Sequence, residues 1–166
     1  MQFAKCEVRD VANAVLEPKE ALEFVSRPSF GGMALFIGQV RDLNLGKSVV
    51  AVEYDVFMPL AVAGFEAIAG EARTVYGDGV AIYIGHAQGR LGVGGLAMVV
   101  AAASPHREEA FGACRQVVEA VKHTSPIWKR EHYTDGSSQW SEGCALCGPE
   151  GAPGYTSRPV PPPRPR

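Results

Sequence analysis

The order of apolar and polar positions along the chain predicts a domain in which strands and helices follow one another. Apolar runs that end at glycine, proline or asparagine are typical of strands. They occur at residues 2–8, 32–40, 49–54, 80–84, 96–103 and 127–133, with a short one at 139–140. Helical spacing predicts helices at 18–25, 58–76 and 105–123. The last helix has an apolar stripe of Ala110, Phe111, Cys114, Val117, Val118 and Val121.

Neighbouring strands in this order can form hairpins, and the helices are isolated from one another. Residues 44–47 supply one turn, and the glycine-rich residues 92–95 supply another. The second turn resembles a phosphate-binding loop only superficially, because a strand follows it where such a loop needs a helix. The pattern therefore predicts the α+β class, with a mostly antiparallel sheet and two long helices.

The composition changes near residue 143, which divides the chain into a predicted domain at 1–142 and a tail at 143–166. The tail is rich in glycine and proline, so it cannot bury enough apolar surface to offset its ordering entropy. Its proline spacing suits an aromatic groove on another protein, although an inert, flexible tail is the favoured interpretation. Cys144 and Cys147 form a lone pair without the four ligands of a structural zinc site, so no metal is expected.

Charge and hydropathy exclude several classes of partner. The formal net charge of −2 gives no electrostatic reason to expect binding to nucleic acid or to an anionic membrane. No apolar run approaches the roughly 20 residues that cross a bilayer, and no secretory signal is visible at the N-terminus. Four cysteines do not make a disulfide scaffold, so we expect a cytoplasmic protein.

Two cations at the start of the last long helix are the first candidates for chemistry. Ser104 is a good N-cap and Pro105 a good first helical residue, which would place His106 and Arg107 at the second and third helical positions. Cations are disfavoured there by the helix dipole, whereas an anion could bind both the backbone donors and the side chains. The alternative is an exposed first turn without a ligand.

A second basic group follows the end of the same helix. Lys122 borders the apolar stripe, where a lysine alone is ordinary, and Pro126 then returns the chain as a strand that carries Lys129, Arg130 and Glu131. If this strand runs back beside the helix, the two lysines could face one pocket. Clustered cations would then make a neutral amine more available. The sequence leaves open whether the lysines converge.

The end of the strand at 32–40 is a further candidate. Gln39, Val40 and Arg41 lie there, and the guanidinium of Arg41 would suit a phosphate. The alternative is a solvated arginine that enters a turn. Cys114 is expected in the core rather than as a nucleophile, and no Ser/His/Asp or paired-carboxylate arrangement stands out.

Together these segments resemble the large, catalytic subunit of molybdopterin synthase. The matching stretches are 36–41 with 44–46, then 104–107 with 110–111, then Lys122 with 126–131, and Trp140. They occur in the family's order and spacing, and the resemblance covers roughly residues 3–142. It implies an α/β-hammerhead fold, and it does not extend to the tail.

The resemblance also implies an activity. The protein would be a sulfurtransferase subunit of molybdenum cofactor biosynthesis, a homodimer within a heterotetramer, without metal or organic cofactor. Each protomer would hold a small ubiquitin-like sulfur-carrier subunit, whose C-terminal Gly-Gly thiocarboxylate enters a pocket near the dimer interface. Sulfur would pass twice from it to cyclic pyranopterin monophosphate to form the dithiolene of molybdopterin.

The family's substrate-binding positions correspond to Gln39, Val40, Arg41, His106, Arg107, Lys122, Lys129, Arg130 and Glu131. Among them, Lys122 matches the family's essential lysine and Lys129 a second important one. Two alternatives from other classes remain. One is a non-catalytic protein that binds a phosphorylated metabolite or protein tail, and the other is an interaction protein that recruits a partner through its proline-rich tail.

Overall fold

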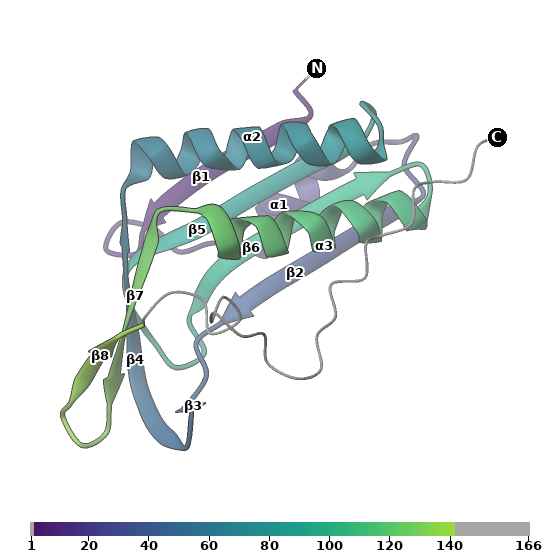
Figure 1. The fold of residues 1–166 in the computed structure, drawn as a ribbon. Coiled ribbons are helices and arrows are strands. Elements are labelled where there is room, and N and C mark those ends of the chain that lie inside the picture. The colour runs from purple at the N-terminus through teal and green to yellow at the C-terminus, as the bar shows by residue number, and fades with distance from the viewer. Residues whose placement is uncertain (1, 142–166) are drawn as a thin grey trace.

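The computed structural model describes residues 2–141, which form one α+β fold (Figure 1). The predicted tail at 143–166, with its two cysteines, lies outside these residues. None of the described helices is both long and apolar enough to cross a membrane. The elements are β1 (Ala4–Asp10), α1 (Pro18–Val25), β2 (Gly32–Gln39), β3 (Leu43–Asn44), β4 (Lys47–Val56), α2 (Met58–Tyr76), β5 (Ala81–Gly92), β6 (Leu96–Ser104), α3 (Arg107–Thr124), β7 (Ile127–Tyr133) and β8 (Ser138–Trp140).

The strands form a sheet with two parts that share the long strand β5. The first half of β5 pairs with β1 and β6, and β6 also pairs with β2. The second half of β5 pairs with β4, which continues to β7 and β8. Only the pairing of β1 with β5 is parallel among those described. The predicted α+β class with a mostly antiparallel sheet is therefore confirmed.

The core lies on both faces of the first part of the sheet. The apolar stripes of α2 and α3 pack on one face, where Phe65 and Val117 are fully buried, and α1 covers the other face around Tyr83. Figure 1 shows α2 and α3 together on one side of the sheet and α1 on the other. Cys114 lies in the core as predicted, and burial raises its pKa to about 11. The assignment of Phe111 to the buried stripe is wrong, because its side chain is 64% exposed.

The start of α3 differs from the prediction. Ser104 pairs with Gly32 as the last residue of β6, so it cannot serve as the N-cap. His106 occupies that position in extended backbone, and Arg107 is the first helical residue. The Ser104 hydroxyl still holds this corner, because it accepts a bond from the backbone N–H of His106 (3.2 Å) and donates to the His106 carbonyl. Glu108 and Glu109 follow Arg107 in the first turn, where the helix dipole favours acidic residues.

Two glycines let the first residues of β2 pass against the start of α3. The N–H of Gly31 donates to the carbonyl of Pro105 at 3.3 Å. A Cβ on Gly32 would lie 2.9 Å from the Cα of Arg107, which is closer than real Cβ contacts. The atoms that this Cβ would meet belong to the backbone, so they cannot move aside as a flexible side chain could. The glycines therefore fix His106 and Arg107 beside the first residues of β2.

The predicted hairpin at 92–95 is confirmed. It joins the antiparallel strands β5 and β6. Gly94 has a φ of 83°, which side-chain-bearing residues rarely adopt, and the N–H of Gly95 donates to the carbonyl of Gly92 at 3.0 Å. The turn before β4 has the same character, since Leu45 and Gly46 both have positive φ.

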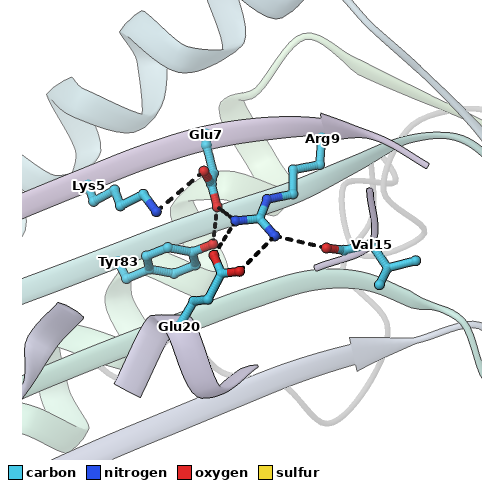
Figure 2. Close-up of polar contacts among 6 residues, drawn as sticks. All are labelled: Lys5, Glu7, Arg9, Val15, Glu20 and Tyr83. Atoms are coloured by element: carbon cyan, nitrogen blue, oxygen red, sulfur yellow. Dashed lines mark hydrogen bonds and ion pairs between the residues drawn. The ribbon is translucent and has the colours of Figure 1, made fainter. Parts of the chain in front are cut away.

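A polar cluster attaches α1 to the sheet (Figure 2). The guanidinium of Arg9 on β1 pairs with Glu7 at 2.8 Å and with Glu20 on α1, and it donates to the carbonyl of Val15 at 2.9 Å. The hydroxyl of the buried Tyr83 donates to Glu7. Since α1 has only eight residues and no side-chain N-cap, this cluster supplies an anchor that its own helical bonds do not.

Two groups of this cluster have shifted pKa values. Burial, followed by its bond to the Glu7 carboxylate, raises the pKa of Tyr83. The hydrogen bond from Arg9 holds the pKa of Glu20 below its usual value of 4.5, although desolvation acts in the opposite direction. A carboxylate with a lowered pKa stabilises the folded state only while it is ionised.

We expect Glu20→Gln to reduce the free energy of unfolding at neutral pH. The reduction should disappear as the pH falls below 4.5, because native Glu20 is then protonated in the unfolded chain and finally in the folded one. Urea unfolding across this pH range measures the effect. Glu23→Gln is the control, since this exposed residue of α1 pairs with the exposed Lys19. An undiminished difference under acidic conditions would contradict the role given to the Arg9 pair.

Candidate functional site

A polar cavity of about 50 Å³ lies where the end of β2 meets the second part of the sheet. The pairing of β4 with β7 places Tyr54 opposite Lys129 and Val52 opposite Glu131, so these residues share one face. The 41–44 segment approaches the same face from the end of β2. The cavity is lined by Gln39, Val40, Arg41, Leu43, Asn44, Val49, Val52, Tyr54, Lys129 and Glu131.

Glu131 is the central polar residue of the cavity wall. Its side chain is 6% exposed, and its carboxylate accepts bonds from Lys129 Nζ (2.8 Å), Asn44 Nδ2 (2.7 Å) and the Tyr133 hydroxyl (2.9 Å). Burial alone would raise its pKa, but these three donors outweigh burial and lower it. Glu131 is therefore an ionised anchor that holds the Lys129 ammonium in place, with few lone pairs left for a ligand.

The end of β2 is fastened to the hairpin between β5 and β6. The N–H of Val40 donates to the carbonyl of Gly95 at 3.0 Å, and its own carbonyl accepts from Gly94 at 2.9 Å. Gln39 Nε2 also donates to the carbonyl of Gly94, at 3.1 Å. Arg41 is exposed and donates to Asn44 Oδ1 at 3.3 Å, which leaves most of its donors available to a ligand.

Lys122 lies on the last turn of α3 and does not line the cavity. Its ammonium is 5.3 Å from the centroid of the Phe36 ring, at cation–π distance. Phe36 precedes Gln39 by three residues on β2, so Lys122 lies at the same end of the fold as the cavity. Lys122 is exposed, and no acidic side chain among residues 2–141 forms an ion pair with it.

Arg130 lies on the opposite face of β7 from Lys129 and Glu131. Successive residues of a strand point to opposite faces, and the guanidinium of Arg130 bonds to Ser138 Oγ (3.0 and 2.7 Å). It also lies 5.8 Å from the centroid of the Trp140 ring. Within one protomer, Arg130 is thus turned away from the cavity.

His106 and Arg107 lie at the far end of α3. Fifteen residues separate Arg107 from Lys122, which at about 1.5 Å per residue is a rise of roughly 22 Å. Both residues are exposed. One protomer therefore gathers part of the predicted site, namely Gln39, Val40, Arg41, Lys129 and Glu131, with Lys122 nearby. It leaves His106, Arg107 and Arg130 outside.

Two polar residues of the cavity wall, Asn44 and Tyr54, were not among the predicted site residues, and neither were the apolar Leu43, Val49 and Val52. Asn44 was seen only as part of a turn, and Tyr54 was seen only as part of a strand. The signal for Tyr54 was the alternation of Val52, Tyr54 and Val56, which puts all three on one face of β4. The alternation of side chains along a strand does not by itself show that one face of the strand lines a cavity.

The chain matches a known protein family. The family described as MoaE protein matches residues 11–124, more than half of the chain. The molybdopterin synthase catalytic subunit of Synechococcus elongatus is 41% identical over 127 residues, which cover 76% of this chain and 77% of the relative. Molybdopterin synthase catalytic subunit 1 of Mycobacterium tuberculosis is 37% identical, over 75% of this chain and 84% of the relative.

Solved structures give the same result. The molybdopterin synthase structure from Staphylococcus aureus superposes with a TM-score of 0.76 at 28% identity, covering 82% of this chain and 96% of that one. A complex of subunits 1 and 2 of molybdopterin-converting factor from Helicobacter pylori shares the fold, with a TM-score of 0.66 at 20% identity. The resemblance inferred from the sequence is confirmed, and the chain belongs to the MoaE protein family.

Proposed function

We propose that the protein is the catalytic subunit of a molybdopterin synthase, in which it transfers sulfur to cyclic pyranopterin monophosphate. The sulfur would come from the C-terminal thiocarboxylate of a small carrier subunit. The observation that carries this proposal is the cavity in which the buried Glu131 holds the Lys129 ammonium, with Lys122 and Arg41 at the same end of the fold. The Helicobacter pylori neighbour is described as a complex of two subunits, which supports a partner subunit here too.

The size of the cavity indicates which substrate group enters it. Pockets for small molecules usually measure about 300–1,000 Å³, whereas this cavity measures about 50 Å³. It fits a group of a few atoms, such as the end of a peptide, and it is too small for a pterin. We therefore place the carrier's terminal group inside the cavity and the pterin at its mouth.

The two cysteines within the described residues do not suit a role as sulfur nucleophile. Cys6 and Cys114 are the cysteines within residues 2–141, and burial raises their pKa values to about 12 and about 11. Both would be thiols, not thiolates, at neutral pH. This chemistry agrees with sulfur that arrives on a partner.

The unpaired edge of the sheet supports a second copy of the chain as the other partner. Among the described strands, only β6 pairs with β2. Apolar side chains on β2 are exposed beside this edge, namely Met33, Leu35 and Ile37. An apolar groove of about 340 Å³ lies between β2 and α3 on the other face, with the exposed Phe111 on its wall. An open edge flanked by apolar surface is usually covered.

Antiparallel pairing of β2 with its copy would complete the site. A twofold axis at the middle of the strand places Gly32 of one protomer beside the Gln39 end of the other. Since the glycines hold the start of α3 against Gly32, the partner's His106 and the partner's Arg107 would arrive next to Arg41. The basic residues that one protomer separates would then surround one receptacle.

The roles follow from this arrangement. Arg41, with His106 and Arg107 of the second copy, would hold the cyclic phosphate of the pterin. Lys122 would engage the carrier's terminal carbonyl or carry a proton during attack on the pterin, and Lys129 would stabilise developing negative charge. Glu131 acts through Lys129 as a positioning residue. Arg130 has no role in the cavity of its own protomer.

Reconstitution with thiocarboxylated carrier and pterin substrate tests the role of Lys122. We expect Lys122→Ala to reduce product formation by at least about 100-fold, since it removes a positioned donor at the reacting group. Lys19→Ala is the control, because Lys19 is an exposed lysine on α1. Near-native turnover by Lys122→Ala would contradict the proposed role. Pterin binding without any product from the native protein would favour the non-catalytic alternative.

A second prediction separates the charge of Glu131 from its hydrogen bonds. We expect Glu131→Gln to lower the free energy of unfolding by roughly 1–3 kcal/mol and to slow turnover, because Lys129 loses its ionic partner. Tyr133→Phe removes one hydrogen-bond donor to Glu131 and leaves the charge of Glu131. It should therefore lower the free energy of unfolding by only about 1 kcal/mol and leave turnover unchanged.

Urea unfolding and the reconstituted assay measure the two effects. Because the pKa of Glu131 is lowered in the folded protein, the stability difference between native and Glu131→Gln should shrink as the pH falls below 4.5. Equal turnover by Glu131→Gln and the native protein would show that Lys129 needs no anchor.

A further inference from the structure

Tyr54 occupies a position in the cavity that the roles above do not use. Its side chain lines the cavity directly across the β4–β7 pair from Lys129. On its other side, β4 pairs Tyr54 with Gly89 of β5. Tyr54 and Lys129 are therefore adjacent groups on one wall.

The ring of Tyr54 is held in a fixed orientation. It packs edge-on against the ring of His86, with centroids 5.1 Å apart and planes at 80°. His86 is 7% exposed, and its Nδ1 lies 2.8 Å from the carbonyl of Ala87, which requires a proton on that nitrogen. Burial lowers the pKa of His86 to about 4, so the ring that supports Tyr54 stays neutral.

The hydroxyl of Tyr54 differs from the hydroxyls of Tyr83 and Tyr133. Those of Tyr83 and Tyr133 donate to carboxylates, but within residues 2–141 the Tyr54 hydroxyl has no hydrogen-bond partner. Burial, and then the negative charge of Glu131, raises its pKa to about 12. The group therefore keeps its proton at neutral pH and can donate it to a ligand.

We propose that the Tyr54 hydroxyl donates a hydrogen bond to an oxygen of the carrier's C-terminal group, beside Lys129. This inference rests on the proposed function and extends it to a residue that binds the carrier. Lys129 and Tyr54 both line the cavity from opposite positions of the β4–β7 pair, while the Glu131 carboxylate is already occupied by its three donors. An acceptor-rich terminal carboxylate or thiocarboxylate is the group that complements such a wall.

The test is calorimetric titration with two forms of the carrier, one ending in its free C-terminal carboxylate and one lacking its last two residues. We expect Tyr54→Phe to weaken binding of the complete carrier by about 10-fold, the usual effect of one hydrogen bond to a charged group. The shortened carrier should bind the native protein and the variant alike. Tyr76→Phe is the matched control, because its hydroxyl also has no hydrogen-bond partner among residues 2–141 but packs between α2 and α3.

Two results would overturn the inference. The first is an affinity of Tyr54→Phe for the complete carrier within twofold of the native affinity. The second is an equal loss of affinity for both forms of the carrier, because this would mean that the substitution had displaced the cavity wall. Product formation by the native protein with thiocarboxylated carrier tests the proposed function separately. Normal turnover together with an unaffected Tyr54→Phe variant would therefore refute the role of Tyr54 alone.

Discussion

The length of α3 is the constraint on which the organisation of the site depends. A helix of 18 residues is a stiff rod about 27 Å long, and cations lie at both of its ends. The fold holds each end firmly, since Gly32 packs against the first residue, Arg107, and Lys122 lies against the ring of Phe36. A single protomer cannot bring these ends together, so one anion can meet both only between two chains.

The two halves of the proposed site differ in how they are built. The half within one protomer is preorganised, because the buried Glu131 fixes Lys129 and because Asn44 joins the 41–44 segment to β7. The cavity of this half measures about 50 Å³, which is room for a group of a few atoms. The other half depends on β2, whose open edge and exposed apolar neighbours suit a second copy. The division matches a reaction with a narrow peptide end as one substrate and a bulky pterin phosphate as the other.

Apolar periodicity predicted the long elements well, because it reports burial directly, and the bounds of α2 and β7 agree with the prediction. Predictions from local sequence were wrong where contacts between residues far apart in the sequence determine the structure. Ser104 has the chemistry of an N-cap, but pairing with Gly32 draws it into the sheet. Helical spacing could not show that Phe111 borders an open groove. The motif that contains Arg130 could not show that its side chain points away from the face of Lys129 and Glu131. The sequence did not predict Tyr54 as a site residue, because only the pairing of β4 with β7 places it opposite Lys129.

The most direct measurement of the central claim is complementation between two inactive chains. Lys122→Ala and Arg107→Ala chains, mixed in equal amounts under conditions that allow exchange, form mixed dimers for half of the population. Each mixed dimer has one intact site of two if Lys122 and Arg107 meet across the interface. The account therefore predicts recovery of about a quarter of native turnover. Turnover that stays at the level of the separate variants, with exchange verified, would contradict it.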